Sequence, residues 1–136
     1  MNTEDISLTV QLLSNIVTLA TPNHLEKKHF SNVQCATLTT NGEANEHPII
    51  TDELQILTGK TSHYTHPRYI TRNTHGTGCT LSSAITANLA QGLPLQQSCS
   101  EAIRYCVFLL SKSNAYDLGS GNGSLGHELS SWTFPR

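Results

Sequence analysis

The residues best suited to chemistry lie in one short stretch, residues 72–83, where a glycine-rich turn runs directly into a helical pattern. Gly76 and Gly78 flank a threonine, so the backbone can turn sharply and a ligand can come close to the main chain. His75 precedes this turn and Cys79 follows it. The stretch therefore combines an accessible backbone with an imidazole and a thiol.

A helix is expected directly after the turn, because an apolar stripe follows at helical spacing: Leu81, Ala84, Ile85 and Leu89. The free amides and the dipole at a helix N-terminus favour an anion. Cys79 falls in the first turn, where the same field stabilises a thiolate. We therefore predict an anion-binding turn with an activated sulfur. The structural alternative is a plain strand-to-helix connection in which Cys79 is a small buried residue.

Other chemistry is open to the same residues. His63, His66, His75 and Cys79 are all potential zinc ligands, but their spacing matches no zinc pattern, and surface histidines are the simpler interpretation. His75 and Cys79 are also close enough in sequence to form a thiolate–imidazolium pair across the turn.

The elements before the turn indicate an α/β fold. Residues 4–15 have helical spacing, and residues 16–20 predict a short, buried, β-branched strand at the centre of a parallel sheet that is covered on both faces. A second strand is expected at residues 35–39. Residues 26–34 make a poor helix, so the crossover between these strands is shorter than a parallel pair normally needs.

Residues 49–66 predict a β-hairpin, and residues 68–70 a strand that leads into the glycine-rich turn. Gly92 is expected to end the first helix and Pro94 to start a second one. Residues 118–124 contain too many glycines for regular structure and predict a surface loop.

The length and composition of the chain exclude several classes of function and location. A chain of 136 residues suits a single domain, and a net charge of −2 with scattered basic residues argues against nucleic acid as a partner. No apolar run of signal-peptide or membrane-spanning type is present, so we expect a cytoplasmic protein without membrane contact. The four cysteines form no Cys-x-x-Cys pair, and reduced thiols are expected.

Residues 73–84, Asn-Thr-His-Gly-Thr-Gly-Cys-Thr-Leu-Ser-Ser-Ala, closely resemble the anion-hole motif of the hydroxymethylpyrimidine/phosphomethylpyrimidine kinases of thiamine biosynthesis, in the ribokinase-like superfamily. The resemblance implies that Gly76, Thr77, Gly78 and Cys79 form the anion hole for the transferring phosphoryl group. It also implies that Cys79 takes the proton from the substrate hydroxyl.

Three further segments resemble the family in the same order. Residues 21–26 are similar to its magnesium and phosphate loop, residues 51–68 to its edge hairpin, and residues 118–123 with His127 to its closing glycine-rich loop near the nucleotide. The site residues implied by the resemblance are Cys79 and His75 for catalysis, Gly76, Thr77, Gly78, Thr74 and Gly121 for the nucleotide, and Asn23 and Glu26 for the metal.

The resemblance covers only the C-terminal half or so of the family. The N-terminal half, which supplies central strands, the lid and most pyrimidine contacts, has no counterpart. Residues 40–42, Thr-Asn-Gly, stand where the family has a lysine and two glycines. The expected fold is an incomplete, three-layer, ribokinase-like α/β fold, with residues 1–136 as one partial domain.

The implied function is ATP-dependent, Mg²⁺-assisted phosphorylation of hydroxymethylpyrimidine or its monophosphate. One alternative is a truncated, catalytically inactive paralogue that retains the phosphate or nucleotide cradle. Another is a pyridoxal kinase-like activity, since His75 and Cys79 could engage an aldehyde. Half a sheet leaves an open edge, so a homo-oligomer or a complementing chain is the expected macromolecular partner.

Overall fold

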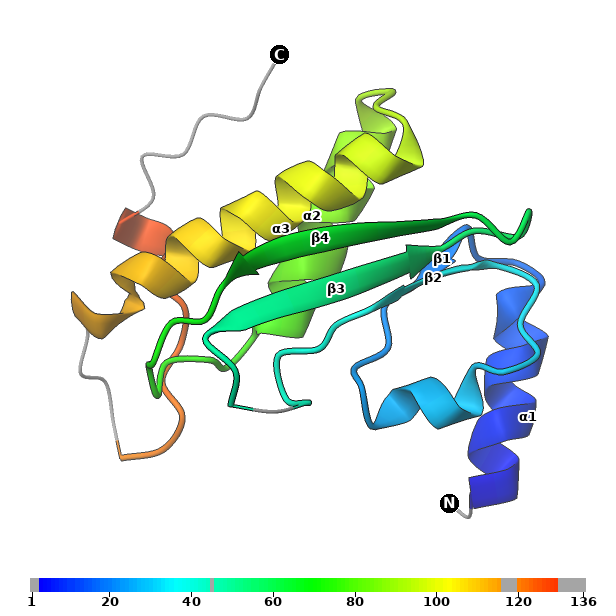
Figure 1. Ribbon diagram of the computed structural model, residues 1–136, viewed down its shortest axis with the longest axis horizontal. Coiled ribbons are helices and arrows are strands. Elements are labelled where there is room, and N and C mark those ends of the chain that lie inside the picture. Colours follow the sequence, from blue (N-terminus) through cyan, green and yellow to red (C-terminus); the bar gives the residue numbers. More distant parts are fainter. Residues whose placement is uncertain (1–2, 45, 116–119, 130–136) are drawn as a thin grey trace. The chain divides into compact units, whose positions relative to one another are not determined.

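The computed structural model describes residues 3–44, 46–115 and 120–129 (Figure 1). The chain forms two compact units, Met1–Arg68 and Tyr69–Arg136. The first contains a β-sheet with a helix, and the second contains a pair of helices. That the chain acts as one domain stays a prediction.

The sheet of the first unit has four strands in the order β1-β2-β3-β4 (Figure 1). β1 and β2 are parallel, whereas the pairs β2–β3 and β3–β4 are antiparallel. Leu38 on β2 lies opposite Leu54 on β3, and both side chains are fully buried. The strands are β1 Leu19–Ala20, β2 Ala36–Thr39, β3 Ile49–Gln55 and β4 Thr61–Pro67.

The predicted hairpin is confirmed in β3 and β4, which pair along their whole length. Gly59 turns the chain between them in the left-handed conformation, with φ of 81°. Its amide donates to the Ile56 carbonyl at 2.9 Å. A residue with a Cβ would be strained in this conformation, which explains the glycine.

The predicted central strand at residues 16–20 is wrong in part. The helix before it is confirmed as α1, Thr3–Ser14, but only Leu19–Ala20 is extended, and this strand lies at one end of the described sheet. In the described part of the chain β1 pairs with β2 alone, so nothing covers the residues before it. Ile16 is consequently 81% exposed rather than buried.

The second unit is built on α2, Thr77–Ala90, and α3, Leu95–Lys112, which pack against each other (Figure 1). Both helices were predicted, as were the end of the first near Gly92 and the start of the second near Pro94. Gly92 follows α2 with φ of 87°, and Pro94 is the residue before α3. The apolar side chains that these helices bury are Leu81, Ala84, Ile85, Cys99, Ala102, Ile103, Cys106 and Leu109.

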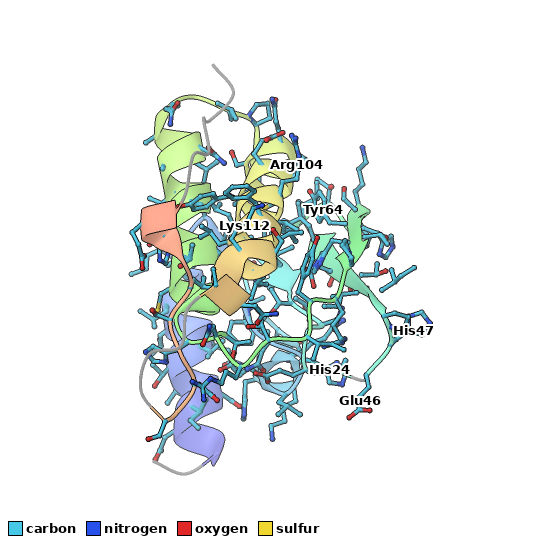
Figure 2. The ribbon with its side chains drawn as sticks, turned by 90° about the vertical axis from the view of Figure 1, so that its left-hand side faces the viewer. His24, Glu46, His47, Tyr64, Arg104 and Lys112 are labelled. Carbon is cyan, nitrogen blue, oxygen red and sulfur yellow. The ribbon has the colours of Figure 1, made fainter. Side chains whose placement is uncertain are left out.

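A polar pair fixes the connection between these helices. Asn88 is buried near the end of α2, and its Nδ2 donates to the Ser98 carbonyl in α3 at 3.1 Å. Burying an amide without such a bond would be costly. The opposite face of α3 is charged: Arg104 projects from it and donates to Glu101 at 2.9 Å, and Lys112 projects near its end (Figure 2).

The predicted strand at residues 68–70 is wrong, because these residues make no ladder. The Arg68 amide donates to the Pro48 carbonyl at 2.8 Å, just beyond the hairpin. The carbonyl of Ile70 instead accepts from the Asn114 side chain at 3.2 Å, and the Ile70 side chain is 91% exposed. The Asn114 side chain thus donates the hydrogen bond that a neighbouring strand would otherwise have donated to the Ile70 carbonyl.

Short 3-10 turns complete the described chain: η1 Glu26–His29, η2 Ser113–Ala115 and η3 His127–Leu129. The four cysteines are free, as expected. Across the described ranges, every helix is too short or too polar to cross a membrane.

Candidate active site

The glycine-rich turn lies at the N-terminus of α2, as predicted. Gly76 is the residue before the helix, and its backbone is left-handed, with φ of 86° and ψ of 4°. A Cβ built at this position would meet nothing within 4 Å, so the backbone conformation rather than space requires glycine. Within the described residues, no side chain caps this helix end.

The absence of a cap leaves backbone donors exposed. The Thr77 amide donates to the Thr74 carbonyl at 3.3 Å, and the Thr80 amide donates to the Gly76 carbonyl at 2.9 Å. Among the described residues, the amides of Gly78 and Cys79 between them have no acceptor. Two N–H groups at a helix N-terminus are a suitable site for an anion. That they bind a phosphoryl group stays a prediction.

Cys79 is exposed in the first turn of α2. The other cysteines are buried, and burial raises the pKa of Cys99 to about 12 and also raises the pKa of Cys35. The thiols of Cys35 and Cys99 therefore stay protonated, and all three buried cysteines are shielded from solvent. The structural alternative, in which Cys79 is a small buried residue, is therefore wrong, and Cys79 is the accessible thiol of the chain.

The structure uses the His75 backbone rather than its side chain. Its amide donates to the Gly123 carbonyl at 3.0 Å, and residues 75 and 124 form an isolated parallel bridge. The His75 side chain is exposed, and within the described chain no hydrogen bond joins it to Cys79. The proposed thiolate–imidazolium pair stays a prediction.

The closing loop runs along the glycine-rich turn. Besides the His75 bridge, His127 Nε2 lies 3.0 Å from the Thr80 hydroxyl in the first turns of α2. Gly121 is exposed in this loop, with open space around it. Residues 120–124 have no regular structure apart from the bridge, as predicted, whereas residues 118–119 of that prediction lie outside the described residues.

Sequence reasoning missed the residues that join this loop to the turn. Asn73 is 2% exposed, and its Nδ2 donates to the Ser113 carbonyl at 2.5 Å. A Cβ on Gly123 would lie 1.9 Å from Asn73 Oδ1, so only glycine fits there. The several glycines of residues 118–124 indicated that the backbone approaches another group closely somewhere in this loop. The sequence alone does not show which glycine contacts a buried side chain.

Asn23 and Glu26 lie together in the first unit, on the turn that follows β1. The Asn23 amide donates to Glu26 Oε2 and the Glu26 amide donates to Asn23 Oδ1, each at 2.9 Å. This reciprocal pair has the pattern of a capping box and satisfies two donors where η1 begins. The turn lies beside the end of β2, since Thr40 bridges to Asn23.

These two residues also fit a magnesium ion. Amide and carboxylate oxygens are the ligands that Mg²⁺ prefers, and Glu26 is exposed. In the described chain Glu26 Oε1 accepts no hydrogen bond, while Oε2 and Asn23 Oδ1 accept one each. No group of three His, Cys, Asp or Glu side chains that could hold a metal occurs in the described residues. A metal here would therefore keep several water ligands.

Comparison with known proteins places these features in a family context. Residues 33–126 match the family model of phosphomethylpyrimidine kinase. A hydroxymethylpyrimidine/phosphomethylpyrimidine kinase of Rhizobium meliloti is 47% identical over 60 residues, 44% of this chain and 23% of that protein. The thiamine biosynthesis bifunctional protein ThiED of Geobacter sulfurreducens is 41% identical over 85 residues, 61% of this chain and 17% of that protein. The chain thus spans under a quarter of either relative.

The fold comparison agrees. The structure is similar to a pyridoxal kinase of Bacillus subtilis, solved as an ADP complex, with a TM-score of 0.78 and 22% identity. The match covers 94% of this chain and 56% of that kinase. The predicted ribokinase-like α/β fold is confirmed, in the partial form that was expected.

The contact between Gly123 and Asn73 gives a test of how the closing loop is held. We expect Gly123→Ala to lower the free energy of unfolding by about 1 to 3 kcal/mol, because the added methyl displaces a buried, hydrogen-bonded amide. Gly121→Ala is the matched control, expected to change it by less than about 0.5 kcal/mol, because the space there is open. Urea unfolding measures both. Equal effects of the two substitutions would contradict this packing.

Proposed function

The chain belongs to the phosphomethylpyrimidine kinase family, and on that premise we propose that it carries out ATP-dependent phosphorylation of hydroxymethylpyrimidine or its monophosphate in thiamine biosynthesis. The observation that carries the proposal is the uncapped N-terminus of α2. There a left-handed Gly76 presents the amides of Gly78 and Cys79 without an acceptor in the described chain. The family match includes this turn.

Backbone donors fixed in this way stabilise negative charge that develops on a transferring phosphoryl group, because they need no reorganisation during the reaction. The Gly78 and Cys79 amides take that role. Thr74 and Thr77 hold the turn through the 2.7 Å bond from the Thr77 hydroxyl to the Thr74 carbonyl. Gly121, in the loop beside the turn, leaves open space for the nucleotide.

The chemistry at Cys79 is proton transfer. As the substrate hydroxyl oxygen bonds to the γ-phosphorus of ATP, the bond from that phosphorus to the bridging oxygen of ADP breaks. The hydroxyl proton passes to the Cys79 thiolate, which acts as the general base. His75, four residues earlier in the sequence, is the second side chain that we propose for catalysis.

Asn23 and Glu26 are the residues that would hold magnesium. The ion, when bound, supplies positive charge to the nucleotide phosphates. The free Oε1 of Glu26 and the remaining lone pairs of the capping-box oxygens are the available donors.

The comparisons favour a pyrimidine alcohol over pyridoxal as substrate. The sequence relatives are named as pyrimidine kinases or thiamine biosynthesis proteins, whereas the pyridoxal kinase likeness, at 22% identity, concerns the fold alone. We place the reaction in the cytoplasm, where ATP and magnesium are supplied.

The purified chain, incubated with γ-labelled ATP, magnesium and hydroxymethylpyrimidine, is expected to form labelled product. Cys79→Ala should lower kcat about 100-fold or more, in the range that general acid–base catalysis contributes. Ser83→Ala, at an exposed position on the same helix, is the control and should retain the rate. Product from the Cys79→Ala variant at the unsubstituted rate would reject the role of Cys79. ATP binding without any product would instead identify a nucleotide-binding module.

A partner is proposed for the open side of the first unit. Leu8, Leu12 and Ile16 lie four residues apart along α1 and just beyond it, and all three side chains are more than half exposed. β1, which follows them in the chain, pairs with β2 along one edge, and its other edge is unpaired in the described sheet. A little under half of the Bacillus subtilis kinase lies outside the match. We propose that a polypeptide carrying the N-terminal half of the kinase fold packs here.

Sedimentation velocity tests this partner, with the N-terminal part of the Rhizobium meliloti relative added as a separate polypeptide. A one-to-one complex is expected, because the added part buries the exposed apolar row. The double substitution Leu12→Lys and Ile16→Lys should abolish it, whereas Gln11→Lys, exposed on another face of α1, should not. A stable dimer of this chain alone, or no complex, would contradict the proposal.

A further inference from the structure

The loop between β2 and β3, residues 40–48, has no role in the mechanism above, although it begins at the carboxyl end of β2. The Thr40 amide donates to the Pro22 carbonyl at 3.0 Å, and Thr40 bridges to Asn23. The start of this loop therefore lies beside the turn that would hold magnesium. Carboxyl ends of neighbouring parallel strands are where α/β folds bind ligands.

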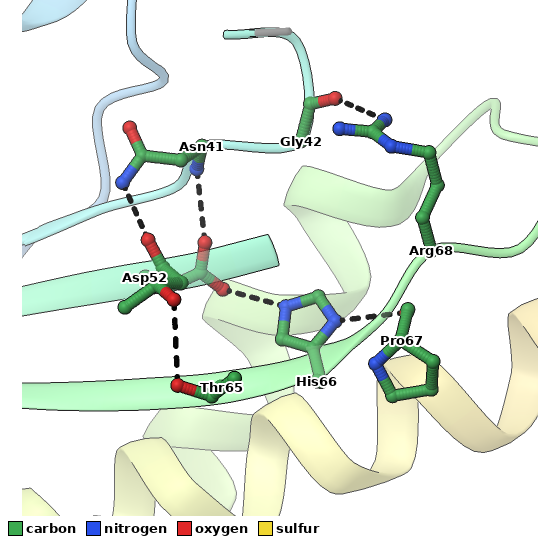
Figure 3. A network of polar contacts seen from close by, with 8 residues as sticks. Asn41, Gly42, Asp52, Thr65, His66, Pro67 and Arg68 are labelled. Atoms are coloured by element: carbon green, nitrogen blue, oxygen red, sulfur yellow. Dashed lines mark hydrogen bonds and ion pairs between the residues drawn. The ribbon is translucent and has the colours of Figure 1, made fainter. Parts of the chain in front are cut away.

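A buried carboxylate fixes the start of the loop (Figure 3). Asp52 on β3 is 4% exposed, and its Oδ1 accepts the Asn41 amide at 2.9 Å. The Asn41 side chain donates in turn to the Thr51 carbonyl at 2.7 Å. A carboxylate is costly to bury unless its oxygens accept hydrogen bonds. The bond from the Asn41 amide therefore stabilises the buried Asp52 and at the same time fixes the position of Asn41.

The second oxygen of Asp52 is taken by a histidine. His66 Nε2 on β4 lies 3.1 Å from Asp52 Oδ2, and its Nδ1 lies 3.2 Å from the Pro67 carbonyl (Figure 3). Because both ring nitrogens face acceptors, the bonds are complete only when both nitrogens carry protons. The residue pair is then a partly buried ion pair between imidazolium and carboxylate.

Several groups act on the pKa of His66. Burial lowers it and the charge of Arg68 opposes protonation, but the hydrogen bond and charge of Asp52, with the Pro67 carbonyl, outweigh both and raise it. A raised pKa means that the contact stabilises the fold fully below the ordinary histidine value of about 6.5. This stabilisation is lost as the pH rises through the raised pKa.

Arg68 contacts the loop near its start and near its end. Its guanidinium donates to the Gly42 carbonyl at 2.6 Å and to the His47 carbonyl at 2.8 Å. The Glu46 and His47 side chains project outward from this part of the loop (Figure 2). Asp52, His66 and Arg68 thus join the loop to the hairpin at both ends.

We propose that Asp52 and His66 are positioning residues that hold the start of this loop, residues 40–42, beside the Asn23–Glu26 turn and so support binding of the magnesium nucleotide. The inference rests on the proposed function. Deprotonation of His66 removes the positive charge beside Asp52 and leaves the Pro67 carbonyl without its donor, so the loop loosens and nucleotide affinity falls as the pH rises.

Hydrogen exchange of the Asn41 amide tests the positioning without any ligand. Its protection factor is expected to fall about tenfold in Asp52→Ala and to decrease with rising pH in the unsubstituted chain. In His66→Gln, the neutral amide still donates to Asp52 but carries no positive charge, so protection should match the high-pH value of the unsubstituted chain and lose its pH dependence. His63→Gln, exposed on the same strand, is the control. Unchanged protection in Asp52→Ala would overturn the positioning role.

Calorimetric titration with magnesium-ADP tests the link to the ligand. Asp52→Ala should weaken binding about fivefold or more, and His66→Gln should remove the pH dependence that His63→Gln retains. If Asn41 loses protection while affinity stays unchanged, the pair is structural only and the inference is overturned. If the unsubstituted chain binds no nucleotide, the proposed function fails together with the ligand part, and hydrogen exchange still decides the positioning part.

Discussion

The site depends on the left-handed backbone of Gly76. This conformation lets the chain enter α2, and among the described residues no side chain caps the helix and the amides of Gly78 and Cys79 have no acceptor. Any other residue at that position would be strained or would shift the turn. The apolar face of α2, packed on α3, keeps the helix end in place, and the bond between Thr80 and His127 adds a brace from the closing loop.

The two units satisfy the ends of their helical turns in opposite ways. In the first unit, the amides of Asn23 and Glu26 each donate to the other residue's side chain, so these two donors are paired within the protein. In the second unit, the corresponding donors of α2 stay unpaired in the described chain. A capped end stabilises the fold, whereas an uncapped end retains its attraction for anions. The start of α2 therefore keeps two free donors among the described residues, and their role in binding phosphate stays a prediction.

Local patterns predicted much of this structure. The hairpin, both long helices and the position of Cys79 followed from alternation, helical spacing and the turn preferences of glycine, which act over a few residues. The resemblance of residues 73–84 added the family and the partial coverage, both confirmed by the comparisons. The roles of individual site residues stay predictions, because each role is a contact with ATP, magnesium or the substrate.

The errors arose where distant residues decide the structure. Residues 16–17 have the composition of a buried strand, but no described neighbour covers them, so they are exposed. Residues 68–70 are not a strand because an asparagine far along the chain takes the Ile70 carbonyl. The Asp52–His66 pair and the close approach of Gly123 to Asn73 likewise join positions that no local pattern relates.

The central claim is that backbone amides at the start of α2 bind the phosphoryl group. The most direct measurement is a ¹⁵N–¹H NMR titration of the chain with magnesium-ATP, following the amide signals of Gly78 and Cys79. If these amides bind the phosphoryl group, the two signals shift together and saturate with a single dissociation constant. Saturating shifts elsewhere, with both of these signals unmoved, would contradict it.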